Sequence, residues 1–328
     1  GGGPGALRED GRRGAEARRR NGPTTNVAHV AMPLRIQTFD ILIWHSPRLC
    51  VSAASFMSSF THGTTTLAYR SYGHGPAQVL AFHGFGRTGE DFALFGPLLA
   101  ERCTIHAFDL HFHGGSNTLG ERAHAPFTPP ELAAYFTAFA DHISAAKVTL
   151  LGYSLGGRIA LSLLTTMPER VAHVVLVAPD GLKTRPWYRG LAASRFGRHL
   201  YGRFVENPHR VHAIMNTLHG DGLMRAKLHR FLIGQTDSQL KRQQVHDVWL
   251  SYRLIEPDLS HVGRVLRERA IPLHLYLGRT DSVIPAHLAQ GLKRQAPKLV
   301  HVQLLEAGHV LLTPELAPQI AAALGAGT

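Results

Sequence analysis

The sequence has few cysteines, few charged residues and no long hydrophobic run. Cys50 and Cys103 are its only cysteines in 328 residues, which is too few for a disulfide framework and indicates a reducing compartment. No stretch of about 18 uninterrupted apolar residues occurs, so a membrane-spanning helix is excluded. Hydrophobic residues make up 44% and charged residues 18% of the chain, and this composition excludes disorder over the whole length. We therefore expect a folded cytoplasmic protein without a transmembrane segment.

Acidic residues are the scarcer charge, and the formal net charge is +12. Residues 182–270 carry most of the excess, with sixteen Lys and Arg against seven Asp and Glu. A basic segment can attract nucleic acid, anionic lipid or an anionic substrate. Here the basic residues are scattered, and no aromatic–basic stacking platform accompanies them. The pattern favours a solvated helical surface, and no nucleic-acid partner is expected.

Residues 1–56 differ in composition from the rest of the chain. They begin with a segment rich in Gly, Arg and Ala that has no apolar periodicity, which is typical of disorder. The apolar stretch at 41–44 is too short for a secretory signal. We expect residues 1–56 to be a disordered or non-native extension, with the native protein starting at Met57.

From residue 64 onward, short apolar runs alternate with helical patterns. Runs rich in Val, Ile, Leu and Phe predict strands at residues 64–72, 78–83, 104–109, 148–153, 173–178, 273–278 and 300–305. Near-continuous apolar strands are typical of a parallel sheet that is buried on both faces. Helices are predicted between the strands at residues 91–100, 129–146 and 155–166, and the second of them has apolar residues spaced by three and four. This alternation predicts an α/β fold with a mostly parallel sheet and right-handed crossovers.

The alternation of strands and helices stops once, in residues 182–270. This segment has no core strand and is predicted to form several short helices. Its aromatic residues include Trp187, Tyr188, Trp249 and Tyr252. An insertion at this point would lie over the carboxyl ends of the strands, where open α/β sheets bind ligands. We therefore predict a core of residues 57–181 and 271–328 and a helical cap of residues 182–270.

The strongest chemical signal lies at the junction of a predicted strand and a predicted helix. The sequence there is Gly152-Tyr153-Ser154-Leu155-Gly156-Gly157. A Gly-x-Ser-x-Gly turn between strand and helix is tight and strained, and it lifts the serine hydroxyl clear of the sheet. Ser154 is therefore the predicted nucleophile.

A serine hydroxyl needs a base that takes its proton, and the base needs a carboxylate that orients it. His309 follows the last predicted strand in Glu306-Ala307-Gly308-His309 and is the expected base. Asp281 follows the strand before it and is the expected orienting acid. The chain order Ser, Asp, His is one of those in which such triads occur. Asp180, which follows the strand at 173–178, remains the alternative acid.

A developing oxyanion needs backbone N–H donors that are already in place. His83-Gly84-Phe85-Gly86 follows the strand at 78–83. The N–H groups of Phe85 and Leu155 can converge on one point, and Leu155 also begins a helix, where the dipole favours negative charge. We interpret His83 as a structural residue bonded to the backbone of its own loop.

Together these motifs resemble the α/β-hydrolase family over about residues 60–326. The matching pieces are His83 to Gly86, Asp109-Leu110-His111-Phe112-His113-Gly114-Gly115-Ser116, the turn around Ser154, Gly278 to Asp281, and Gly308-His309. The resemblance implies an eight-stranded sheet with helices on both faces, a helical cap after the sixth strand, and no cofactor. Phe112 stands where the family commonly has Gly, and we expect it to narrow the pocket. No motif for a metal is present.

The residues predict a serine hydrolase that acts on a small carboxylic ester or a related small-molecule acyl compound. Tyr153, Arg158 and Trp187 are candidate substrate contacts. The run from Gly152 to Arg158, with Gly114-Gly115-Ser116 before it, also resembles the SHCHC synthase of menaquinone biosynthesis, which would imply a lyase or C–C hydrolase acting on an anionic substrate. A third possibility is a non-catalytic ligand receptor on the same fold. The sequence leaves the oligomeric state open.

Overall fold

The computed structural model describes residue 1 and residues 57–116, 121–183 and 194–326. The chain divides into two units, Gly1–Ser52 and Ala53–Thr328, and the architecture below belongs to the second. The predictions for residues 2–56, for Cys50 and for Trp187 and Tyr188 lie outside the described residues.

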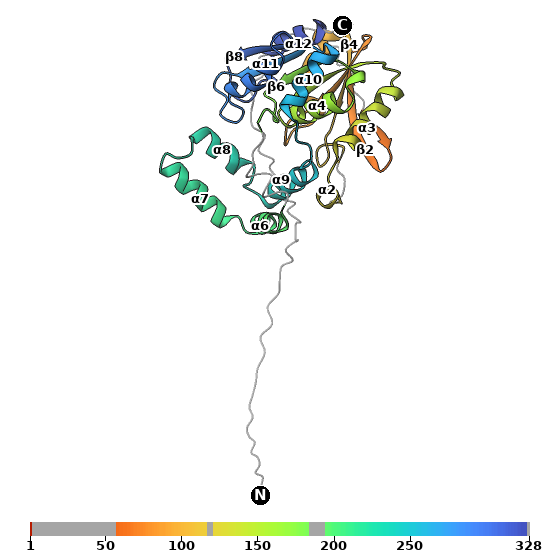
Figure 1. The fold of residues 1–328 in the computed structure, drawn as a ribbon. Coiled ribbons are helices and arrows are strands. Elements are labelled where there is room, and N and C mark those ends of the chain that lie inside the picture. Colours follow the sequence, from red (N-terminus) through yellow and green to blue (C-terminus); the bar gives the residue numbers. More distant parts are fainter. Residues whose placement is uncertain (2–56, 117–120, 184–193, 327–328) are drawn as a thin grey trace, which may run out of the picture. The chain divides into compact units, whose positions relative to one another are not determined.

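The core of the second unit is one eight-stranded sheet (Figure 1). Its strands are β1 Met57–His62, β2 Thr65–Tyr72, β3 Ala77–Phe82, β4 Cys103–Phe108, β5 Val148–Tyr153, β6 Val171–Val177, β7 Leu273–Gly278 and β8 Val300–Leu305. They lie in the order β1-β2-β4-β3-β5-β6-β7-β8. β1 and β2 pair in antiparallel fashion, as do β2 and β4, and the remaining pairs are parallel. The predicted mostly parallel eight-stranded sheet is therefore confirmed.

Each face of the sheet has its own hydrophobic cluster. Successive strand residues point to opposite faces, so Leu80 enters one cluster and Val79 the other. The first cluster packs under α3 Pro129–His142, α4 Leu155–Thr166, α10 Leu259–Arg269 and α11 Ala289–Gln295. The second packs under the 3₁₀ helix η1 Gly89–Phe95, the short α1 Gly96–Leu99, and α12 Ala317–Ala326. Helices on both faces are thus confirmed, and the central strands are buried because both faces are covered.

Three local predictions differ from the structure. The eighth strand, β1, was not among the predicted runs, because its side chains are mostly exposed and show no apolar pattern. The helix predicted at 91–100 is η1 followed by α1, with Pro97 inside the first turn of α1. The helix predicted at 129–146 ends at His142, because Ser144 adopts a left-handed φ of 56°.

Between β6 and β7 the described chain forms only helices. They are α6 Arg195–Glu206, α7 His209–Gly220, α8 Ala226–Gly234, α9 Gln239–Ser251 and α10. α10 packs against α4 and α11 of the sheet region. We refer to α6, α7, α8 and α9 as the insertion helices. The remaining short elements are α2 Glu121–His124, η2 Pro168–Arg170 and η3 Ala286–Leu288.

α9 contacts the loop that follows β4 at two points. Gln244 donates a side-chain hydrogen bond to the Phe112 carbonyl at 2.8 Å. The Tyr252 hydroxyl, one residue past the end of α9, accepts the His111 N–H at 3.3 Å.

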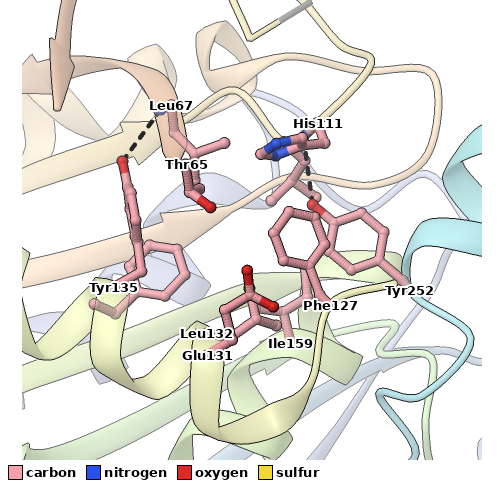
Figure 2. Close-up of a pocket in the computed structure, with 11 residues that line it drawn as sticks. Thr65, Leu67, His111, Phe127, Glu131, Leu132, Tyr135, Ile159 and Tyr252 are labelled. Atoms are coloured by element: carbon pink, nitrogen blue, oxygen red, sulfur yellow. Dashed lines mark hydrogen bonds between the residues drawn. The ribbon is translucent and has the colours of Figure 1, made fainter. Parts of the chain in front are cut away.

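A small cavity of about 10 Å³ lies beside this contact. Figure 2 shows Tyr252, Phe127 and His111 next to one another at its wall. That volume suits one water molecule, and among the described residues the buried Nδ1 of His111 has no partner. This cavity is too small for a substrate.

A chain that starts at Met57 is expected to fold and to keep its activity. Such a chain retains β1, whose Phe60 packs edge-on against Tyr135 and Phe139 of α3 at ring-centroid distances of 5.5 and 5.3 Å. The melting temperature should change by less than about 3 °C, which corresponds to about 1 kcal/mol or less for a chain of this size.

The matched control is a chain that starts at Gly63 and so lacks β1. Its melting temperature should fall clearly, because the outer edge of β2 and the rings around Phe60 lose their partners. A large fall already on starting at Met57 would contradict the prediction and show that residues 39–44 pack on the rest of the protein.

Candidate active site

Ser154 lies at the sharp turn between β5 and α4. Its φ of 49° and ψ of −114° are unfavourable for a residue with a side chain, and such strain is typical of functional turns. The neighbouring glycines make the turn possible. A Cβ on Gly152 would lie 2.6 Å from the Gly156 carbonyl oxygen, and one on Gly156 would overlap the Phe82 carbonyl oxygen. The Ser154 side chain is consequently held above the carboxyl ends of the strands.

His309 approaches Ser154 from the loop after β8. Its Nε2 lies 3.1 Å from the Ser154 hydroxyl oxygen, and its Nδ1 lies 2.8 Å from Asp281 Oδ2. These partners assign the proton to Nδ1, which donates to Asp281, and leave Nε2 to accept the serine proton. The structure brings Ser154, His309 and Asp281 into one hydrogen-bonded row.

Asp281 is held rigidly in the loop after β7. Its side chain is fully buried, and its Oδ1 accepts the N–H groups of Val283 and Ile284 at 2.7 and 2.9 Å. Oδ1 is thus occupied by the backbone, and Oδ2 faces His309. An acid with one oxygen fixed by its own loop can orient an imidazole without rotating away.

Asp180 has a different partner. Its carboxylate forms an ion pair with the Arg158 guanidinium and also accepts the Gly181 N–H. Its own N–H donates to the Ser154 carbonyl at 2.8 Å. Asp180 therefore ties the turn after β6 to the serine turn, and the carboxylate that contacts His309 is that of Asp281.

Phe85 and Leu155 line the same cavity as Ser154. Leu155 is the first residue of α4, so its N–H has no acceptor within the helix. Among the described residues, no hydrogen bond uses the Phe85 N–H. The Gly156 N–H donates to the His83 carbonyl at 3.0 Å, which joins the serine turn to the loop that carries Phe85. Both residues predicted to supply oxyanion donors therefore line the cavity at Ser154.

The loop after β4 contains functional candidates that the sequence analysis did not single out. Asp109 is fully buried, accepts the N–H groups of Gly89 and Gly115 at 2.7 and 2.8 Å, and pairs with Arg70. His113 is also buried, and its Nε2 accepts the Gly86 N–H at 2.9 Å. The sequence pointed to this loop only through its polar residues and glycines from Asp109 to Ser116. The spacing of these residues does not show which distant groups they bond to.

The candidate substrate contacts fall in different places. Arg158 lines the cavity at Ser154, where it is paired with Asp180. Tyr153 is not among the lining residues; its ring stacks on His309 at 5.8 Å and its hydroxyl donates to the His309 carbonyl. Trp187 lies outside the described residues.

Phe112 has a left-handed φ of 63°, which explains why glycine would be suited to this position. Its side chain does not line the cavity, so the expectation that it narrows the pocket is not supported.

The cavity at Ser154 has a volume of about 1140 Å³. Besides Ser154, the sheet region contributes to its wall the apolar residues Phe85, Leu155, Val283 and Ile284 and the polar residues Arg158, Asp180 and Ser282. The insertion helices supply most of the remaining wall. From α6, α7, α8 and α9 it includes Leu200, Phe204, Val211, Ile214, Met215, Leu228, Leu232, Val245, Val248 and Trp249. Three exposed cations, Lys183, Arg203 and Arg210, also contribute to it.

The described residues contain neither a candidate metal site nor a candidate membrane-spanning helix. No group of three or more His, Cys, Asp or Glu is arranged there to hold a metal ion. None of the helices in the described ranges combines the length and the apolar character needed to cross a membrane. Cys103 is buried in β4, and burial raises the pKa of its thiol to about 11, so it is protonated at neutral pH.

Comparison with known proteins establishes the family. Residues 78–315 match the family model for the alpha/beta hydrolase fold, and the chain belongs to this family. It is 29% identical over 256 residues to a pimeloyl-[acyl-carrier protein] methyl ester esterase of Aeromonas hydrophila, which covers 74% of this chain and 92% of the relative. It is 26% identical over 275 residues to an uncharacterized hydrolase of Bacillus subtilis, covering 82% and 96%.

Among solved structures, the chain is similar to an alpha/beta hydrolase enzyme from a Medee basin deep-sea metagenome library. The TM-score is 0.59 at 17% identity, and the match covers 82% of this chain and 96% of that one. At this identity the likeness supports the fold alone.

Proposed function

We propose that the protein is a serine hydrolase that cleaves a carboxylic ester through an acyl-enzyme. The observation that carries this proposal is the row from Ser154 through His309 to Asp281, at the wall of a large cavity. The names of relatives such as the methyl ester esterase of Aeromonas hydrophila support ester chemistry. Without a carboxylate that orients the base, the serine would be a poor nucleophile.

In the proposed reaction, the Ser154 oxygen attacks the ester carbonyl carbon while His309 Nε2 takes the hydroxyl proton. Asp281 stabilises the imidazolium that results. The N–H groups of Phe85 and Leu155 hold the oxyanion. His309 returns the proton to the departing alcohol, which leaves an acyl group on Ser154. A water molecule, deprotonated by His309, then attacks this acyl group and releases the acid.

The cavity points to an apolar acyl chain as the substrate. Its wall includes the apolar residues Phe85, Leu155, Val283 and Ile284, and the charged pair Arg158–Asp180 that also lines it is already formed within the protein. We propose that the insertion helices act as the cap of this site, because they supply most of the outer wall. They would contact the part of the substrate's acyl chain that extends away from Ser154. A small-molecule substrate and a cytoplasmic location belong to this proposal.

A lyase or C–C hydrolase that acts on an anionic substrate is the second candidate. The observation in its favour is that Lys183, Arg203 and Arg210 line the cavity, a grouping that the sequence did not reveal. Against it, Arg158, the arginine shared with the SHCHC synthase motif, is already paired with Asp180. A non-catalytic receptor is less well supported, because it would not need the hydrogen-bonded row at Ser154.

Neutral p-nitrophenyl esters of increasing chain length are expected to be turned over. Each methylene that enters the apolar wall should raise kcat/KM by up to about fourfold, because burial of one CH₂ contributes about 0.8 kcal/mol. Between 0.05 and 0.5 M salt, kcat/KM should change by less than about twofold, because salt screens only interactions between charges. The Ser154→Ala variant supplies the background rate.

The anionic alternative makes the opposite prediction. A carboxylate-bearing substrate would then be turned over while neutral esters are not, and its rate would fall steeply with salt and on Arg203→Gln or Arg210→Gln. Assay of SHCHC formation tests the specific lyase reaction. That set of results would replace the esterase proposal.

A further inference from the structure

Two buried histidines hold the loop that carries the Phe85 N–H. His83 directly follows β3 and His113 lies in the loop after β4, and both are at most 3% exposed. Their rings meet edge-on with centroids 4.9 Å apart. The His113 ring also meets the Phe85 ring edge-on at 5.6 Å. His113 is not part of the hydrogen-bonded row at Ser154, so its position needs another explanation.

Each histidine fixes one of the two peptide groups that flank Phe85. In the peptide between Gly84 and Phe85, the carbonyl accepts the Nδ1–H of His83 at 2.6 Å. In the peptide between Phe85 and Gly86, the N–H donates to Nε2 of His113 at 2.9 Å. A trans peptide is planar, and its C=O and N–H point in opposite directions. Fixing the Gly84 carbonyl therefore also fixes the direction of the Phe85 N–H.

The hydrogen-bond partners require both histidines to be neutral. His113 Nδ1 donates to the His111 carbonyl at 2.9 Å, which leaves Nε2 with the lone pair that the Gly86 N–H needs. His83 Nε2 likewise accepts the Leu110 N–H at 2.9 Å. Burial lowers the pKa of His113 and, together with the nearby His113 ring, lowers the pKa of His83 to about 3. At neutral pH both rings therefore keep their acceptor nitrogens.

His113 itself is held by a loop that is anchored at several points. Asp109 fixes the start of the loop through Gly89, Gly115 and Arg70. The N–H of His113 donates to the Leu110 carbonyl at 3.0 Å. Gln244 of α9 holds the carbonyl of the preceding residue, Phe112. The acceptor for Gly86 is thus fixed to the sheet and to the insertion helices by bonds other than the one to Gly86 itself.

We propose that His113 is a positioning residue for the oxyanion donor. His83 holds the Gly84–Phe85 peptide that carries the donor, and His113 holds the next peptide, Phe85–Gly86. With the backbone fixed on both sides of Phe85, its N–H keeps its direction toward the oxygen that becomes charged in the transition state. This inference rests on the proposed ester hydrolysis. A donor that is fixed before the reaction stabilises the transition state more than the bound substrate, so loss of the acceptor on His113 should lower kcat and leave KM nearly unchanged.

The test compares two replacements of similar volume. His113→Leu removes the acceptor, and His113→Gln retains an amide oxygen at about the same reach. For a p-nitrophenyl ester we expect His113→Leu to lower kcat by about 10- to 100-fold, which is at most the effect of losing an entire oxyanion donor. KM should change by less than about threefold, since ground-state binding does not use this hydrogen bond. His113→Gln should recover a large part of kcat.

A trifluoromethyl ketone gives a second readout, because its hemiketal oxygen occupies the oxyanion site. Its inhibition constant should rise in His113→Leu by about the factor lost in kcat. A neutral alcohol forms no hemiketal with Ser154 and so places no charged oxygen in the oxyanion site. Its inhibition constant should not change. The matched control is His106→Leu, which removes another buried histidine, hydrogen-bonded to Ser71 and Gln78 away from the cavity. It should lower the melting temperature and leave kcat unchanged.

Several results would overturn the inference. One is an unchanged kcat in a folded His113→Leu variant. Another is a fall in kcat accompanied by a similar rise in KM and by weaker binding of the alcohol, which would indicate general damage to the site. If His113→Leu does not fold, His113→Asn provides the same test, because its amide is too short to reach Gly86 and the same loss of kcat is expected. Failure of the proposed function is distinct: the wild type itself would then neither cleave esters nor react with a fluorophosphonate.

Discussion

Replacing Ser154 by Ala is expected to lower kcat for ester hydrolysis by about 10⁶-fold, the loss seen when the nucleophile of a serine protease is removed. The Oγ of Ser154 is the only atom of that side chain that can form the acyl bond, and His309 Nε2 lies 3.1 Å from this oxygen. A fluorophosphonate probe should label the wild type in proportion to active sites and should leave the variant unlabelled.

The Ser154→Ala variant should fold normally, because the change removes one oxygen and leaves the hydrogen bonds of the turn's backbone in place. Ser162 of α4 is buried and provides a control serine: labelling should be unaffected by Ser162→Ala. Persistent labelling of Ser154→Ala would show that another residue is the nucleophile.

Asp281→Asn is expected to lower kcat by about 10³- to 10⁴-fold, as the equivalent change does in serine proteases. The amide can present its NH₂ group to His309, and the imidazole then holds the wrong tautomer, with its proton on Nε2 facing Ser154. The backbone bonds from Val283 and Ile284 to Oδ1 can persist with the amide oxygen, so the loss of rate should not require unfolding.

Asp180→Asn is the matched control for the acid. Asp180 is paired with Arg158 and its carboxylate does not contact His309. We expect kcat to stay within about tenfold of the wild type, which is less than about 1.4 kcal/mol of activation free energy. The reverse ranking, with Asp180→Asn the more damaging change, would assign the acid to the loop after β6.

Local sequence was sufficient for the serine turn and for most of the sheet. Gly152, Ser154 and Gly156 stand between an apolar run and a helical pattern, and the backbone conformation at Ser154 follows from the crowding of those glycines. The buried strands were evident because both of their faces are apolar. β1 was not evident, because its side chains are mostly exposed. Backbone pairing with β2, and not burial, holds β1 at the edge of the sheet.

The partners of buried polar groups could not be read from the sequence. Twenty-two histidines are present, and spacing gives no reason to connect His113 with Gly86, 27 residues before it. The register of β3 beside β4 brings the loops after these two strands to the same edge of the sheet. Only that register decides which imidazole nitrogen meets which backbone N–H.

The sequence by itself determined the family, the alternation of strands and helices, and the residues Ser154 and His309 as the expected reacting pair. These depend on contacts within a few residues along the chain, such as the glycines of a tight turn or the side chains of one helix face. The tertiary structure decided that His309 bonds to Asp281 and Asp180 to Arg158, and that scattered cations of the insertion line one cavity. Those outcomes depend on distances between residues far apart in the chain, which are set only when the sheet and the insertion helices pack.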